Sequence, residues 1–185
     1  GRFRSACLVM LMLPFWTSYL VRTYAWMTLL QTEGVINGLL LKLHLISEPL
    51  QMLNTSGAVV LGLTYCFLPF ATLPIYVALE GLDTRLLEAA EDLGADRRQT
   101  FRSVVWPLSL PGVVAGAILS FVPAVGDFVS ADLLGGPDDH MIGNVIQQQF
   151  LGSFNWPFGS ALSMLVILLM GAAMMLYIRT EERHS

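Results

Sequence analysis

The amino-acid sequence predicts an all-α integral membrane protein, a polytopic bundle of transmembrane helices. Hydrophobic residues make up 55% of the 185 residues, charged residues only 13%, and the mean hydropathy is +0.63. A soluble domain carries about 25% charged residues, so this composition indicates that lipid covers much of the surface. Four apolar stretches, each near the roughly 20 residues that cross the hydrocarbon core, support this assignment. We expect a single transmembrane domain over residues 1–185.

The four expected spans cover residues 5–21, 58–79, 108–134 and 158–178. Prolines fall within the first three, and a proline in a span is tolerated only where neighbouring groups satisfy the freed carbonyl. We therefore expect a packed bundle of bent helices; ordinary kinks without a gating role are the alternative. Small residues at 171–173 suit close helix contact in the last span. Aromatic residues that fit an interfacial belt mark the end of the first span: Trp16, Tyr19, Tyr24 and Trp26.

The distribution of Lys and Arg orients the chain. With the N-terminus inside, the cytoplasmic set is Arg2, Arg4, Arg85, Arg97, Arg98, Arg102, Arg179 and Arg183, and the external set is Arg22 and Lys42. This positive-inside bias places both ends and the polar loop 80–107 in the cytoplasm. The outer connections, 23–57 and 135–157, are each expected to hold a short helix, at 35–45 and 142–151.

The polar loop is predicted to form two short helices around a tight turn. Asp83 or Thr84 can cap the first helix, and Gly94 suits the left-handed residue that ends it. Asp96, with Gln99 three residues later, can start the second helix. That helix is expected to stop before Pro107, because the residue before a proline disfavours the helical conformation. The first helix carries an apolar stripe of Leu86, Ala90 and Leu93.

The opposite face of this first helix carries Glu88, Glu91 and Asp92. Like charges at Glu88 and Asp92 repel weakly on a helix, so a basic partner surface would explain the cluster. A merely solvated cytoplasmic face is the alternative. A DNA-reading helix-turn-helix is excluded in practice, because the unit is acidic and tethered to the membrane at both ends.

The spacing around this helix resembles a known motif. Glu88-Ala89-Ala90, three residues, Gly94, nine residues, Val104, one residue and Trp106-Pro107 resemble the EAA loop of permease subunits of binding-protein-dependent ABC importers. Val104 stands where Ile is usual, and Trp106 where Leu is usual. The resemblance implies the helix-bundle fold of such permeases and a coupling helix that sits in a cleft of the ATPase subunit. By this resemblance, the residues expected to couple the permease to the ATPase are Glu88, Ala89, Ala90, Gly94 and Pro107.

The resemblance also implies partners and a location. The partners are an ATP-binding cassette ATPase dimer, a second permease subunit, a periplasmic substrate-binding protein and the lipid bilayer. The location is the bacterial inner membrane. ATP is expected on the partner subunit, so no cofactor is expected on this chain.

Other stretches are similar to the spermidine/putrescine branch of that family: residues 14–26, 123–129, 133–138, 141–146 and 155–158. This resemblance implies polyamine import by alternating access. Such permeases usually have six spans, and the chain begins at Gly1 without an initiator Met. We therefore expect a fragment that lacks about two N-terminal spans.

Asp127 is the main candidate for the substrate pathway, because a carboxylate at membrane depth normally faces a cavity or a partner. Phe128 beside it offers an aromatic face to an ammonium group, and Asp132 follows in the same region. Two alternatives stay open for Asp127: pairing with the other permease subunit, or capping a broken helix near the outer surface. Asp132 could instead belong to a gate or docking surface with Asp138 and Asp139.

Several function classes are excluded or disfavoured. The sequence has no nucleophile–base pair, phosphate-cradling glycine loop or metal-ligand spacing, so we expect a transport subunit rather than an enzyme. It has no basic patch for nucleic acid. Two alternatives are left open. One is an ABC importer of the same type that carries another solute, such as ferric iron or an organic acid. The other is a secondary transporter or channel that works without an ATPase. A non-transporting scaffold would not need the acidic helix.

Overall fold

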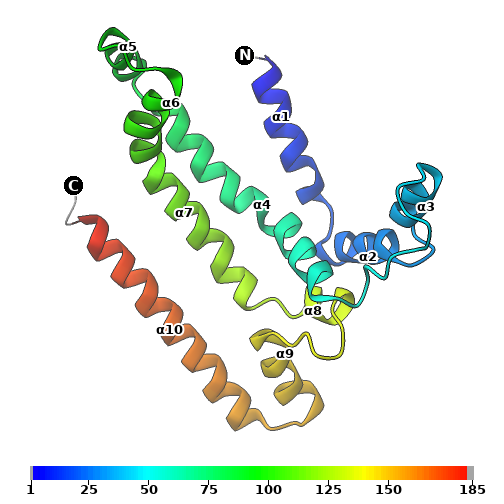
Figure 1. Cartoon of the computed structure of the whole chain (residues 1–185). Helices are drawn as coiled ribbons and strands as arrows, with labels where there is room; N and C mark the ends of the chain where they lie inside the picture. The colour runs from blue at the N-terminus through cyan, green and yellow to red at the C-terminus, as the bar shows by residue number, and fades with distance from the viewer. Residues whose placement is uncertain (1, 183–185) are drawn as a thin grey trace. The chain divides into compact units, whose positions relative to one another are not determined.

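The computed structural model describes residues 2–182, which contain helices and connecting loops but no strand within that range (Figure 1). The elements in order are α1 (Arg2–Met12), the 3₁₀ helix η1 (Leu13–Trp16), α2 (Tyr19–Leu30), α3 (Val35–Lys42), α4 (Ser56–Glu80), α5 (Thr84–Asp92), α6 (Arg97–Thr100), the π-helix η2 (Phe101–Val105), α7 (Trp106–Val125), α8 (Val129–Leu134), α9 (Ile142–Gln147), the π-helix η3 (Gln148–Gly152) and α10 (Trp156–Glu182). They form two compact units, one of residues up to 66 together with those from 122 onward, the other of residues 67–121.

Three helical segments in the described part of the chain are long and apolar enough to cross a membrane. They are Ser56–Glu80, Arg97–Val125 and Trp156–Met175. The predicted span 58–79 lies inside α4, and most of the predicted span 158–178 lies inside the third segment. The short helices predicted at 35–45 and 142–151 are confirmed as α3 and as α9 with η3.

The stretch predicted as a first span, residues 5–21, is not one helix. α1 ends at Met12, a 3₁₀ turn covers Leu13–Trp16, and α2 starts only at Tyr19. Pro14 lies in the 3₁₀ turn, where it cannot donate a backbone hydrogen bond and disfavours a helical residue before it. Thr17 then adopts an extended conformation, with ψ of 154°. The sequence predicted a short span interrupted by Pro14, and the structure shows that interruption as a 3₁₀ turn between two separate helices, α1 and α2.

The predicted third span, 108–134, was wrong at both ends. Its helix continues back through η2 and α6 to Arg97, and it ends at Val125, after which Gly126–Phe128 separate it from α8. Pro107 does not stop the helix, because the preceding turn is a π-helix in which the Trp106 amide donates to the Phe101 carbonyl. A π turn is one residue wider than an α turn, so the chain absorbs the proline without breaking.

Within the second unit, glycines let α7 lie directly against α4. A side-chain carbon at Gly116 would come within 2.6 Å of the Ala71 carbonyl oxygen. A side-chain carbon at Gly112 would overlap the Ala78 side chain and lie 2.8 Å from the Pro74 carbonyl oxygen. The helix backbones themselves form this contact, as in other membrane helix pairs built on small residues.

Replacing Gly116 by valine should therefore force α7 away from α4, because the obstructing atoms are backbone atoms that cannot rotate aside. Overpacking of this kind costs about 1–3 kcal/mol or more. The matched control is Gly171→Val in α10, where an added carbon meets nothing within 4 Å. We expect a lower unfolding temperature in detergent for the first variant only; equal unfolding temperatures for both variants would contradict this packing.

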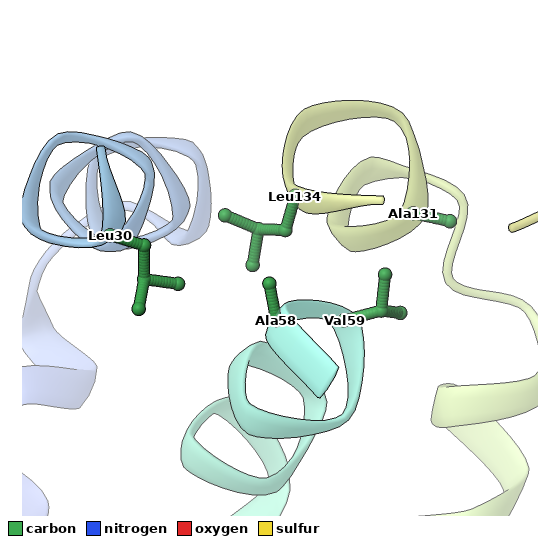
Figure 2. Packing of buried hydrophobic residues seen from close by; sticks show 5 residues of the cluster. All are labelled: Leu30, Ala58, Val59, Ala131 and Leu134. Atoms are coloured by element: carbon green, nitrogen blue, oxygen red, sulfur yellow. The ribbon is translucent and has the colours of Figure 1, made fainter. Parts of the chain in front are cut away.

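Within the first unit, a small apolar cluster joins three helices. Leu30 of α2, Ala58 and Val59 of α4, and Ala131 and Leu134 of α8 are all buried (Figure 2). Leu134 is completely enclosed and packs against Gly62 of α4, where a larger residue would collide with it. This cluster fixes the position of α8, the helix that carries Ser130 and Asp132.

Candidate functional site

The loop between α4 and α7 has the predicted two-helix form (Figure 1). The Asp83 carboxylate caps α5 by accepting from the Arg85 amide at 2.9 Å, and Asp96 caps α6 by accepting from the Gln99 amide at 2.7 Å. Gly94 lies between them with φ of +83°, a conformation that residues with a side chain rarely adopt. The caps and the turn predicted from the sequence are therefore confirmed.

The surface of α5 is open. None of its residues is buried, and two leucines of the apolar stripe are exposed, Leu93 by 88% and Leu86 by 47%. The short elements α6 and η2 lie against α5 but leave these two leucines exposed. Glu88, Glu91 and Asp92 are also exposed. The helix thus presents an open apolar stripe on one face and open acidic groups on the other, a combination suited to a partner surface.

Asp127 is enclosed rather than open. Its Oδ1 accepts from the amides of Val129 at 2.9 Å and Ser130 at 3.3 Å, so the carboxylate caps the start of α8. Its Oδ2 accepts from the Tyr19 hydroxyl at 2.5 Å, and that hydroxyl lies 2.8 Å from the Ser130 hydroxyl. Asp127 is only 8% exposed. Both carboxylate oxygens are engaged, and the residue links α2 to α8.

Arg22 forms a second buried polar feature on α2. Its guanidinium lies 4.4 Å from the centre of the Phe15 ring and 5.9 Å from that of the Tyr19 ring, in the range of cation–π attraction. Its Nε and Nη1 are buried and have no hydrogen-bond partner among the described residues. In the sequence, Arg22 was used only as a charge that orients the chain in the membrane. Its aromatic contact could have been predicted, because Tyr19 is three residues earlier and residues at this spacing are neighbours on a helix.

Asp132 is exposed on α8, and a buried asparagine orients it. The Asn144 side-chain amide donates to Asp132 Oδ1 at 2.5 Å and to the Phe128 carbonyl at 3.0 Å. The Asn144 oxygen accepts from the Met141 amide at 3.0 Å, and Asn144 is 7% exposed. Sequence reasoning missed Asn144, because nothing in the local pattern links α9 to α8.

Two adjoining cavities meet at Asp132. One of about 430 Å³ is lined by Asp132, His140, Asn144, Gln147, Gln148, Leu151 and Gly152. The other, of about 510 Å³, is lined by Gln51, Asn54, Ala131, Asp132, Gly135, Gly136, Pro137, Asp139, His140 and Asn144. Of the three residues predicted for the substrate pathway, Asp132 alone lines these cavities; Asp127 and Phe128 do not, although Phe128 is 36% exposed.

Asp139 lies at the wall of the larger cavity. It accepts from the Ser56 hydroxyl and, through Oδ2, from the Gly136 amide at 2.8 Å. These hydrogen bonds, that from Ser56 most strongly, hold the pKa of Asp139 below its usual value. Asp139 is therefore an anion at neutral pH, and its oxygens already serve the 135–139 turn. No group of three or more His, Cys, Asp or Glu side chains with the geometry of a metal site occurs among the described residues.

Residues 3–180 match the family described as binding-protein-dependent transport system inner membrane component. The chain belongs to this family, so the membership inferred from the 88–107 spacing is confirmed.

Individual relatives refine this assignment. The chain is 46% identical to the spermidine/putrescine transport system permease protein PotB of Haemophilus influenzae over 98% of the chain and 63% of the relative. It is 44% identical to PotB of Escherichia coli over 98% of the chain and 66% of the relative. The inner membrane ABC transporter permease protein YdcU of Escherichia coli is 40% identical over 91% of the chain and 57% of the relative. The resemblance to the spermidine/putrescine branch is confirmed, and the chain spans somewhat less than two thirds of these relatives' length.

The fold has a counterpart of known structure. A bacterial ABC transporter involved in the import of the acidic polysaccharide alginate superposes with a TM-score of 0.79, covering 99% of this chain and 67% of that chain. The sequences are 18% identical, so the similarity concerns the fold. The predicted fold class, an all-α helical bundle of the ABC importer permease type, is confirmed.

Proposed function

We propose that this chain is the membrane-spanning permease part of an ATP-driven importer that moves polyamines across the inner membrane by alternating access. The observation that carries the proposal is the exposed helix α5, held by caps at Asp83 and Asp96 and by the turn at Gly94. In a chain of this family, such a helix transmits ATP-driven motion from a separate subunit. The proposed polyamine substrate is supported by the two PotB relatives at 44–46% identity.

The proposed coupling residues are Glu88, Ala89, Ala90, Gly94 and Pro107. Leu93 supports the docking of an ATPase subunit here, because a leucine that is 88% exposed on a polar loop gains free energy when a partner covers it. The acidic group at Glu88, Glu91 and Asp92 would meet basic side chains across that interface. Pro107 follows the π turn, so movement of the loop would pass directly into α7.

The remaining assembly follows the same proposal. The chain would form a single transmembrane domain. Its loop 80–107 and both of its ends would lie on the cytoplasmic side, as the distribution of Arg and Lys predicts. A second permease subunit, an ATPase dimer and a periplasmic binding protein would complete the importer. The 43% identity over 75 residues to the Escherichia coli permease protein PotC supports a second, related subunit.

The proposed substrate pathway includes Asp132, Phe128 and Asp127. Asp132 and Phe128 have exposed surface in this structure. Contact between Asp127 and substrate would require the Tyr19 hydrogen bond to open, because both carboxylate oxygens are engaged. The permease contributes no bond chemistry to this process; ATP hydrolysis would occur on the partner subunit.

The test is uptake by the complete importer reconstituted in liposomes with its binding protein and internal ATP. We expect uptake of labelled spermidine and putrescine that stops without ATP. Labelled ferric iron and an organic acid such as citrate serve as competing substrates. Uptake of one of these instead would replace the polyamine assignment, and uptake driven by an ion gradient without ATP would overturn the coupling to an ATPase.

A further inference from the structure

We infer that the cavity beside Asp132 is a binding subsite for an ammonium group of the transported polyamine. This inference rests on the proposed function and deepens it, because it assigns one part of the fold to substrate recognition. The cavity lies between α8, α9 and η3, all within the first unit.

The charge of Asp132 is available to a ligand. Its Oδ1 is held at 2.5 Å from the Asn144 amide, and no other hydrogen bond or basic partner of its carboxylate occurs among the described residues. Asn144 is in turn fixed by the Phe128 carbonyl and the Met141 amide. The carboxylate is therefore pre-oriented by a buried, fully hydrogen-bonded side chain and lacks a counter-ion among those residues, which favours binding of a cation.

The rest of the cavity wall suits an ammonium group. An ammonium has three donors and no acceptor, so it needs more than one oxygen or nitrogen acceptor. Gln147 and Gln148 line the cavity, and each carries an amide oxygen that can accept from an ammonium group. Leu151 supplies an apolar contact for the methylene groups that separate the amines of a polyamine.

The donor set distinguishes an organic cation from a metal ion. Calcium takes six to eight oxygen ligands, commonly from several carboxylates, whereas this cavity has Asp132 as its one carboxylate among the described residues. The adjoining cavity shares Asp132, His140 and Asn144 and adds Asp139. An extended cation with amines spaced along its length matches two such neighbouring cavities better than a compact metal ion does.

Asp127 lacks the properties that Asp132 has. It is 8% exposed, its two oxygens accept three hydrogen bonds, and it lines neither cavity. An ammonium group could reach it only after the α2–α8 contact opens. Asp132 is therefore the group that substrate meets in the conformation of this structure.

The experiment compares Asp132→Asn with Asp138→Asn in the complete importer. Both changes remove one negative charge from neighbouring positions, but Asp138 lines neither cavity. The asparagine introduced by Asp132→Asn keeps an oxygen that can accept from Asn144, so the local hydrogen bond is preserved.

We expect Asp132→Asn to raise the KM for spermidine about tenfold or more, as for loss of a charge-assisted contact, with kcat per assembled transporter changed much less. Asp138→Asn should stay within about twofold of the unmodified importer, and Asp132→Glu should restore part of the affinity.

Two results would overturn the subsite while leaving the proposed function intact: equal KM values for the Asp132→Asn and Asp138→Asn importers, or a loss confined to the amount of assembled Asp132→Asn complex with unchanged KM. Failure of the unmodified importer to take up any polyamine would instead overturn the proposed function, and the subsite with it.

Discussion

Replacing Gly94 by valine is expected to reduce polyamine uptake by an order of magnitude or more while the protein still inserts and assembles. Gly94 has φ of +83°, and an added side-chain carbon there would meet nothing within 4 Å. The effect therefore comes from the backbone alone, because a β-branched residue is strongly disfavoured at positive φ. The turn would adopt another conformation and α5 would leave its orientation relative to α6.

The control for this change is Gly94→Asn, since asparagine tolerates the left-handed conformation far better than valine does. Uptake and ATPase activity are measured on the same liposomes, and membrane insertion is followed by the yield of purified complex. We expect ATP hydrolysis without matching uptake in the valine variant and near-normal coupling in the asparagine variant. Normal uptake by Gly94→Val would remove the coupling assignment.

Replacing Asp127 by alanine is expected to destabilise the first unit by about 2 kcal/mol or more, because each buried donor left without an acceptor costs about 1–3 kcal/mol. The donors left behind are the Tyr19 hydroxyl and the amides of Val129 and Ser130. Thermal unfolding of the purified complex in detergent is the measurement. Tyr19→Phe removes one of these hydrogen bonds together with the contact to the Ser130 hydroxyl, but it leaves the amides of Val129 and Ser130 paired with Asp127, so it should cost less.

Asp127→Asn separates this structural role from a role in transport. The asparagine keeps an oxygen for the α8 amides but carries no charge, so most of the stability should remain. Contact between Asp127 and substrate predicts a raised KM for spermidine in this variant with the complex assembled. An unchanged KM would limit Asp127 to joining α2 and α8.

The structure of loop 80–107 was predictable because it depends on local interactions. The Asp83 carboxylate accepts from an amide two residues later in the chain, and the Asp96 carboxylate accepts from an amide three residues later. Gly94 forms the turn through its own positive φ. Such interactions are visible in a short sequence window. The open face at Leu86 and Leu93 was not predictable, because the pattern that gives a helix an apolar stripe does not say whether this chain or a partner covers it.

The span boundaries were less predictable for a related reason. Hydropathy reports how apolar a segment is, not where its helix bends or ends. The 3₁₀ turn at Pro14 and the break after Val125 lie inside stretches that hydropathy assigned to single spans. At Pro107 the error was opposite: a π turn carried the helix through a residue that usually ends one.

By itself the sequence determined the membrane class, the family and the local form of loop 80–107, because composition and closely spaced residues carry that information. The tertiary structure alone decided the roles of the two carboxylates. Tyr19 and Asp127 are 108 residues apart, and Asp132 and Asn144 are 12 apart on different helices. Whether a carboxylate is enclosed by donors or faces a cavity depends on which helices pack around it, and the apolar cluster that fixes α8 against α2 and α4 sets that arrangement.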